Sequence, residues 1–90
     1  MKTINFIYDS RNLGEVKYIN FATGVVHKAT EFASDITLKT GHTTTDLKSI
    51  LGIMALSRVG IHEWEINIEG NDEDDAYLVL NAYLSDYLGK

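Results

Sequence analysis

The chain has 90 residues, of which 44% are hydrophobic and 23% charged, so wholesale disorder is excluded. It has no cysteine, which excludes a disulfide framework, a thiolate metal site and a cysteine nucleophile. The net charge is −5, but positions 72–75 supply four of the thirteen acidic residues, and no basic stripe of the kind that binds nucleic acid is present. Because no apolar stretch is long enough to span a membrane, we expect one cytoplasmic domain over residues 1–90, without nucleic-acid or membrane partners.

The first two predicted elements are a strand and a helix. Over residues 3–8, Ile4, Phe6 and Tyr8 alternate with polar residues, which predicts a strand with one buried face. The period then lengthens, and residues 13–30 predict a helix. Its apolar positions at helical spacing are Val16, Ile19, Ala22, Val26 and Ala29. Gly24, inside this helix, is expected to allow a close contact with the sheet.

Alternation returns over residues 32–40, where Ser34, Ile36 and Leu38 share one face of a second predicted strand. Gly41 then predicts a hairpin turn into a short strand over 43–45. The side chain of Asp46 is expected to cap a helix over 47–56.

A last strand is predicted from the alternation of Trp64, Ile66 and Ile68 with polar residues, and a closing helix begins near Asn71. The apolar face of that helix carries Ala76, Leu80, Tyr83 or Leu84, and Tyr87. The order is strand, helix, strand, strand, helix, strand, helix. One apolar sheet face and three amphipathic helices to cover it predict an α+β open-faced sandwich.

Few residues suggest catalysis or metal binding. His27, His42 and His62 each lack a second ligand at metal spacing, and we expect them to be solvated. The acidic run at 72–75 lacks the spacing of a calcium loop and suits the first turn of a helix. No glycine-rich phosphate loop or nucleophile elbow is present. We therefore expect no metal, no cofactor and no enzymatic activity.

The segment over 47–56 is the most informative, because its apolar side chains spread around most of the helix. A helix on one face of a sheet cannot bury them all, so some should form an exposed apolar patch. Ser49 would lie in the first turn, where a phosphate meets unpaired N–H groups and the positive end of the dipole. The alternatives are that the closing helix covers the patch and that Ser49 is an ordinary helix-start serine.

These residues carry a resemblance to a known family. The segment from Asp46 to Leu56 resembles the regulatory-serine helix of the histidine-containing phosphocarrier protein, HPr, of the bacterial sugar phosphotransferase system. Residues 32–36 (Phe-Ala-Ser-Asp-Ile) resemble the second strand of that family, and residues 70–76 its entry to the last helix. Together they cover the chain from Tyr18 onward without an internal gap. The resemblance implies a four-stranded antiparallel sheet with three helices on one face, in the order βαββαβα.

The resemblance departs at the family's catalytic segment, Gly-x-His-Ala-Arg-Pro-Ala. Tyr18 stands at the position of the phosphorylated histidine, Asn20 at that of the arginine and Phe21 at that of the proline. A tyrosine phenol, with a pKa of about 10, forms a far less transferable phosphoester than imidazole does. His27 lies about two turns further along the helix and cannot substitute. We therefore predict that the chain is not a histidine phosphocarrier.

Apart from the catalytic segment, the resemblance implies a regulatory or protein-binding role. It implies Ser49 as a phosphorylation site, with Ile50, Leu51 and Met54 as the docking surface. The implied partners are a serine kinase and a transcriptional regulator of carbon catabolite repression. Asp46 stands where the family usually has Asn, and its carboxylate would oppose a nearby phosphate. Two alternatives stay open: a phosphocarrier that uses another residue, and an interaction domain unrelated to sugar transport.

Overall fold

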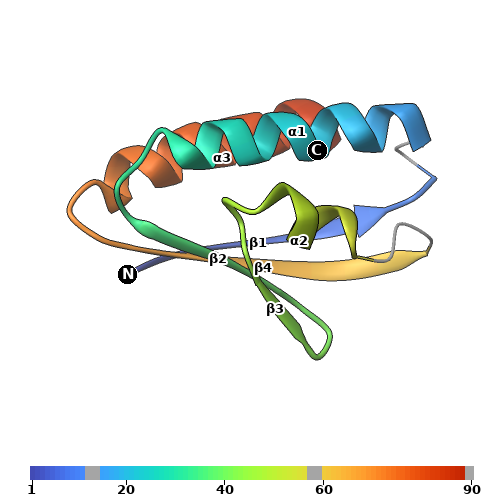
Figure 1. Cartoon of the computed structure of the whole chain (residues 1–90), viewed down its shortest axis with the longest axis horizontal. Helices are drawn as coiled ribbons and strands as arrows, with labels where there is room; N and C mark the ends of the chain where they lie inside the picture. Colours follow the sequence, from blue (N-terminus) through green and yellow to red (C-terminus); the bar gives the residue numbers. More distant parts are fainter. Residues whose placement is uncertain (12–14, 57–59, 89–90) are drawn as a thin grey trace.

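The computed structural model describes residues 1–11, 15–56 and 60–88. In chain order, its elements are β1 (Lys2–Asp9), α1 (Glu15–Thr30), β2 (Asp35–Thr40), β3 (Thr43–Asp46), α2 (Ile50–Met54), β4 (Ile61–Glu69) and α3 (Glu73–Leu88). The strands form one antiparallel sheet in the order β1-β4-β2-β3. Helices α1 and α3 lie side by side along the sheet, and the short α2 lies near the end of β3 (Figure 1). The predicted α+β open-faced sandwich is confirmed.

The apolar face of the sheet is the one that alternation predicted. Strand β4 lies between β1 and β2, with Phe6 opposite Trp64 on one side and Leu38 opposite Ile66 on the other. The fully or nearly fully buried members are Ile4, Tyr8, Ile36, Leu38, Trp64, Ile66 and Ile68. Phe6 is half-buried against them. Ser34, expected on this face of a strand that starts at residue 32, is buried but precedes β2, which begins only at Asp35. This face supplies one wall of the core, and the helices supply the other.

Helix α1 buries a different face from the one its spacing predicted. Val16 and Ile19, expected in the core, are 73% and 44% exposed. The buried positions are Tyr18, Phe21, Ala22, Val25, Val26 and Ala29. The two faces share Ala22, Val26 and Ala29, so the first turns decide between them. There, two aromatic rings remove more apolar area from water than valine and isoleucine can, and the helix rotates to bury them.

Gly24 permits a close contact, but with α3 rather than with the sheet. A Cβ at this position would lie 1.9 Å from the Tyr83 hydroxyl oxygen. That hydroxyl donates a hydrogen bond to the Phe21 carbonyl at 3.1 Å, and the Tyr83 ring stacks on the Phe21 ring. The expected contact between Gly24 and the sheet is therefore corrected: the missing side chain makes room for a tyrosine that joins α3 to α1.

Helix α3 begins at Glu73, two residues later than expected, and buries Ala76, Leu80 and Leu84 as its apolar spacing predicted. Of its two tyrosines on this side, Tyr83 is half-buried and Tyr87 is still 36% exposed. Within residues 1–11, 15–56 and 60–88, no helix has both the length and the apolar character needed to cross a lipid bilayer.

Candidate docking surface on helices α1 and α2

Helix α2 is shorter than the sequence suggested, and a different residue caps it. The expected helix over 47–56 is confined to Ile50–Met54. Asp46, the expected cap, still pairs with Thr37 in the sheet, so its backbone is extended, and its carboxylate accepts a hydrogen bond from the Lys48 N–H at 2.9 Å. The N-cap is Ser49, whose Oγ accepts a hydrogen bond from the Gly52 N–H at 3.1 Å. Ser49 therefore precedes the helix and already satisfies one of its free N–H groups.

The apolar side chains of this segment divide between core and solvent. Leu47 and Ile53 are fully buried, whereas Leu51 is 80% exposed and Ile50 is 36% exposed. Met54 is half-buried and packs against the core. The expected apolar exposure is therefore found mainly at Leu51, and of the three predicted docking residues Met54 is the least available.

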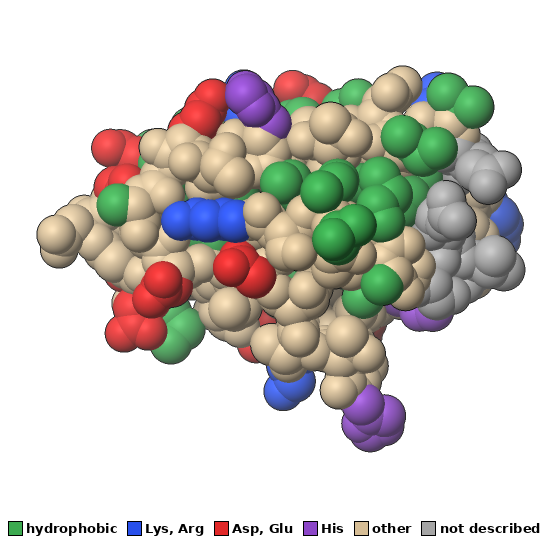
Figure 2. Space-filling view, viewed as in Figure 1, with side chains coloured by type: hydrophobic (Ala, Val, Ile, Leu, Met, Phe, Trp, Pro, Cys, Tyr) green, Lys and Arg blue, Asp and Glu red, His purple; other side chains and the backbone are tan. Residues whose placement is uncertain are grey.

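Helix α1 extends this apolar area. Val16 and Ile19 come from the first turns of α1, and α1 packs directly against α2. Figure 2 shows hydrophobic side chains gathered over α2 and continuing toward the start of α1. We call the exposed apolar residues Val16, Ile19, Ile50 and Leu51 the α1–α2 surface. Sequence reasoning missed its α1 half, because it assigned Val16 and Ile19 to the core.

Tyr18 lies beneath this surface. Its side chain is fully buried, and its hydroxyl donates a hydrogen bond to the Ile53 carbonyl of α2 at 2.9 Å. Its ring packs edge-on against Tyr8, with centroids 5.6 Å apart. A buried hydroxyl that donates to a backbone carbonyl is a structural group, because it is neither exposed to a second protein nor free to react.

Asn20 and Phe21, which the resemblance placed at the arginine and proline of the family's catalytic segment, differ in their surroundings. Asn20 is exposed and lines a shallow hollow with Lys17, Asp86 and Tyr87. Phe21 is fully buried, with its ring 5.8 Å from that of Trp64. Tyr18 and Phe21 thus belong to the core, and only Asn20 reaches solvent.

The histidines are spread over the molecule. His42 is exposed at the turn between β2 and β3, and His27 lies 3.8 Å from the Glu31 carboxylate on the surface of α1. His62 is half-buried, and its ring stacks on Tyr8 at 6.2 Å, so the expectation that it is simply solvated is wrong. Its place on the inner face of β4, opposite Tyr8, explains the contact.

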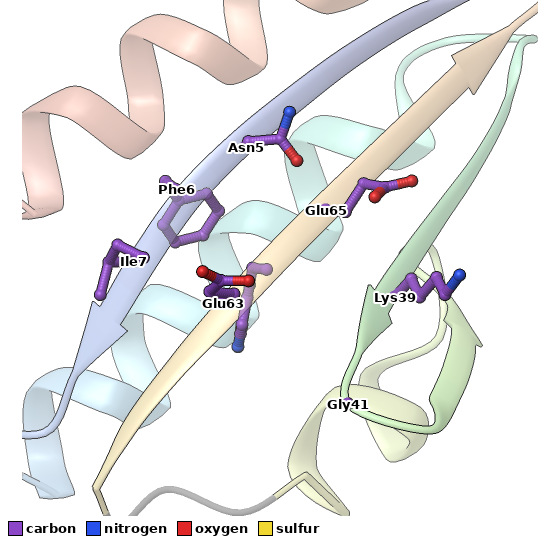
Figure 3. A pocket seen from close by; sticks show the side chains of 8 residues that line it. Asn5, Phe6, Ile7, Lys39, Gly41, Glu63 and Glu65 are labelled. Atoms are coloured by element: carbon purple, nitrogen blue, oxygen red, sulfur yellow. The ribbon is translucent and has the colours of Figure 1, made fainter.

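A second hollow lies on the face of the sheet away from the helices. Figure 3 shows its lining: Glu63 and Glu65 follow each other along β4, between Asn5 and Ile7 of β1 and Lys39 of β2. Lys39 is directly opposite Glu65 in the register. The lining of this hollow contains no serine, threonine, cysteine or histidine, so the candidate site remains the α1–α2 surface.

The fold itself is found in known proteins. The solved histidine-containing phosphocarrier protein of Mycoplasma superposes with a TM-score of 0.82 at 24% identity, covering 97% of this chain and 96% of that one. The catabolite repression protein Crh of Bacillus subtilis superposes with a TM-score of 0.61 at 28% identity, covering 76% of this chain and 78% of that one. The architecture is thus that of the HPr-type phosphocarrier fold.

Sequence comparison identifies the family as well as the fold. A family model described as the PTS HPr component phosphorylation site matches residues 19–86. The phosphocarrier protein HPr of Lysinibacillus sphaericus is 40% identical over 65 residues, which are 72% of this chain and 74% of that protein. The chain belongs to the HPr family of the phosphotransferase system. The matched range begins one residue after Tyr18.

Proposed function

We propose that this chain is a protein-binding, regulatory member of the HPr family that does not carry a phosphoryl group at residue 18. The single observation that supports the proposal most strongly is the burial of Tyr18, whose hydroxyl is bonded to the Ile53 carbonyl. The α1–α2 surface beside it remains exposed. A chain that has lost the reactive group and kept the apolar surface is suited to binding other proteins.

The chemistry at residue 18 argues against phosphoryl transfer. A transferring partner must bring a phosphorylated group to within about 3 Å of the accepting atom, in line with the bond that breaks. The Tyr18 oxygen lies in the core, where α1 and α2 shield it. The phosphoester of a phenol is also a far poorer phosphoryl donor than a phosphohistidine. The exposed Asn20 carries no charge to stabilise a phosphoryl group.

Regulation through Ser49 is the second part of the proposal. Ser49 is only partly exposed, and its Oγ caps α2, one residue before the exposed Ile50. A phosphate on this oxygen would place negative charge at the edge of the α1–α2 surface and change the partners that it accepts. The fold is shared with the catabolite repression protein Crh, and this likeness supports a regulatory role of the same kind. Transcriptional regulators of carbon metabolism are the partners we expect.

The test is incubation with the family's serine kinase and ATP, followed by intact-mass measurement and peptide mapping. We expect one phosphate on Ser49, no phosphate on Ser49→Ala, and slower modification of Leu51→Asp, which removes the most exposed apolar side chain but keeps the serine. An unmodified native chain would remove the regulatory part of the proposal. Equal binding of recovered partners to the native chain and to Ser49→Ala would indicate an interaction domain without this switch.

A further inference from the structure

Helix α2 is too short to hold its own shape. An isolated helix needs roughly 12–15 residues to be even marginally stable in water, and α2 has five. Its geometry therefore depends on contacts with the rest of the molecule. On its N-terminal side the Ser49 cap fixes the Gly52 N–H. On its other side the Ile53 side chain is fully buried in the core.

The third contact comes from α1. The Tyr18 hydroxyl donates to the Ile53 carbonyl at 2.9 Å, which joins residues 35 positions apart in the chain. Ile53 lies in the last turn of α2, where helical carbonyls lack a full set of intrahelical partners, and the Leu56 N–H donates to the same carbonyl at 3.2 Å. The ring that carries this hydroxyl is itself held between Tyr8 of β1 and Phe21 of α1. Tyr18 thus fixes the end of α2 to both the sheet and α1.

This contact determines which way α2 faces. With Ile53 turned into the core and its carbonyl bonded to Tyr18, the side chains of Ile50 and Leu51 are left toward solvent. Resting on the proposed docking role of the α1–α2 surface, we infer that Tyr18 is a positioning residue for that surface. At the position where the family carries its reactive histidine, this chain has a side chain that holds the docking helix in place.

The chain offers a matched control for the Tyr18 hydroxyl. Tyr83 also donates its hydroxyl to a backbone carbonyl, that of Phe21, at 3.1 Å, but it joins α3 to α1 and does not hold α2. Tyr18→Phe and Tyr83→Phe remove the same atom and the same kind of hydrogen bond. If only Tyr18→Phe changes α2, the change is caused by the loss of the bond that positions α2 and not by a general loss of stability.

The experiment is amide hydrogen exchange by NMR on the full chain, free of any partner, for the native protein and both variants. For Tyr18→Phe we expect exchange at Ile53, Ala55 and Leu56 to become about five- to tenfold faster, the size of one lost hydrogen bond, with sheet amides such as that of Ile66 nearly unchanged. For Tyr83→Phe we expect no selective change in α2. Faster exchange throughout the chain for Tyr18→Phe, or unchanged exchange in α2, would overturn the inference.

A second readout separates this inference from the proposed function. The rate at which the family's serine kinase modifies Ser49 should fall about two- to fivefold in Tyr18→Phe and stay unchanged in Tyr83→Phe, because only the first loosens α2. If the kinase leaves the native chain unmodified, the regulatory proposal fails while the exchange experiment still decides the role of Tyr18. If the kinase modifies both variants at the native rate, the positioning role is contradicted.

Discussion

Asp72 ties two distant parts of the chain together. Its carboxylate accepts hydrogen bonds from the N–H of Ala33 at 2.8 Å, from the N–H of Ser34 at 3.0 Å and from the Ser34 hydroxyl. These bonds, the Ser34 hydroxyl first among them, hold the pKa of Asp72 below its usual range. Gly70 makes the approach possible, since a Cβ there would lie 2.6 Å from the Ser34 Cα. Within the acidic run, Asp72 therefore has a structural role, whereas Glu73, Asp74 and Asp75 lie in the first turn of α3.

This contact predicts a dependence of stability on pH. A carboxylate whose pKa is lowered on folding stabilises the native state above its unfolded pKa of about 3.9, and the stabilisation is lost as the pH falls through the lower folded value. Hydrogen bonding by Arg11 likewise lowers the pKa of Asp9, and the Gly70 N–H lowers that of Glu73. The free energy of unfolding should therefore decrease progressively below about pH 5.

Asp72→Asn isolates one part of this effect. We expect the variant to be less stable than the native chain at pH 7 and to lose less stability on acidification, so that the two urea-denaturation curves approach each other near pH 3. Asp75, an exposed residue of the same run, serves as the control, and Asp75→Asn should change the pH dependence of stability less than Asp72→Asn does. A constant stability difference between Asp72→Asn and the native chain from pH 7 to pH 3 would contradict the assignment.

At the level of elements, Gly24 and Tyr83 set the packing of α3 on α1. Glycine inside a helix costs about 1 kcal/mol relative to alanine, so Gly24→Ala would be stabilising if space were available. The new Cβ would instead displace the Tyr83 hydroxyl from the Phe21 carbonyl. We expect a net loss of about 1–2 kcal/mol in the free energy of unfolding, because overpacking outweighs the gain in helix propensity.

Two further variants identify the cause. Thr23→Ala, at an exposed position next to Gly24, should change stability by less than about 0.5 kcal/mol. Adding Tyr83→Phe to Gly24→Ala removes the atom nearest the new methyl group and should recover part of the loss. If the Gly24→Ala protein is as stable as the native chain, α3 does not pack tightly against α1 at Gly24.

The elements could be predicted from sequence where one pattern dominated. Alternation identified the inner residues of the sheet correctly, because a strand has only two faces and one of them is strongly polar. In α1 the spacing suited two overlapping faces, and the choice depended on Tyr18 and Phe21 fitting against the sheet, which spacing does not report. The residue type of Asp46 suits a helix cap, but the register of β3 keeps its backbone extended.

Only part of the candidate site could be predicted from the sequence. Some exposure on α2 could be predicted because a short helix that is apolar on all sides cannot be fully covered, but which side chain is exposed could not; it is mainly Leu51. The exposure of Val16 and Ile19 could not be predicted, because apolar spacing alone favours the other face of α1 for the core. The bond from Tyr18 to Ile53 joins residues far apart in the chain, and no local pattern contains it. The roles of Ser49, Ile50, Leu51 and Met54 in binding remain predictions.

For the whole molecule, the proposal separates the architecture of the family from the family's reactive group. The chain has the sheet and helices of the HPr fold, and its α1–α2 surface is exposed. At residue 18 it has a phenol that completes the core and holds α2. Our proposal that residue 18 accepts no phosphoryl group leaves the exposed surface as the part of the molecule that acts on partners.

The most direct measurement of this claim is phosphoryl transfer from phosphoenolpyruvate through the first enzyme of the phosphotransferase system, followed by intact mass at neutral pH. Native HPr of Lysinibacillus sphaericus serves as the positive control. We predict no phosphorylation of the native chain, and none of Tyr18→His, because an imidazole at this position would be buried. A phosphorylated native chain, with the label mapped to Tyr18 or to any histidine, would contradict the account.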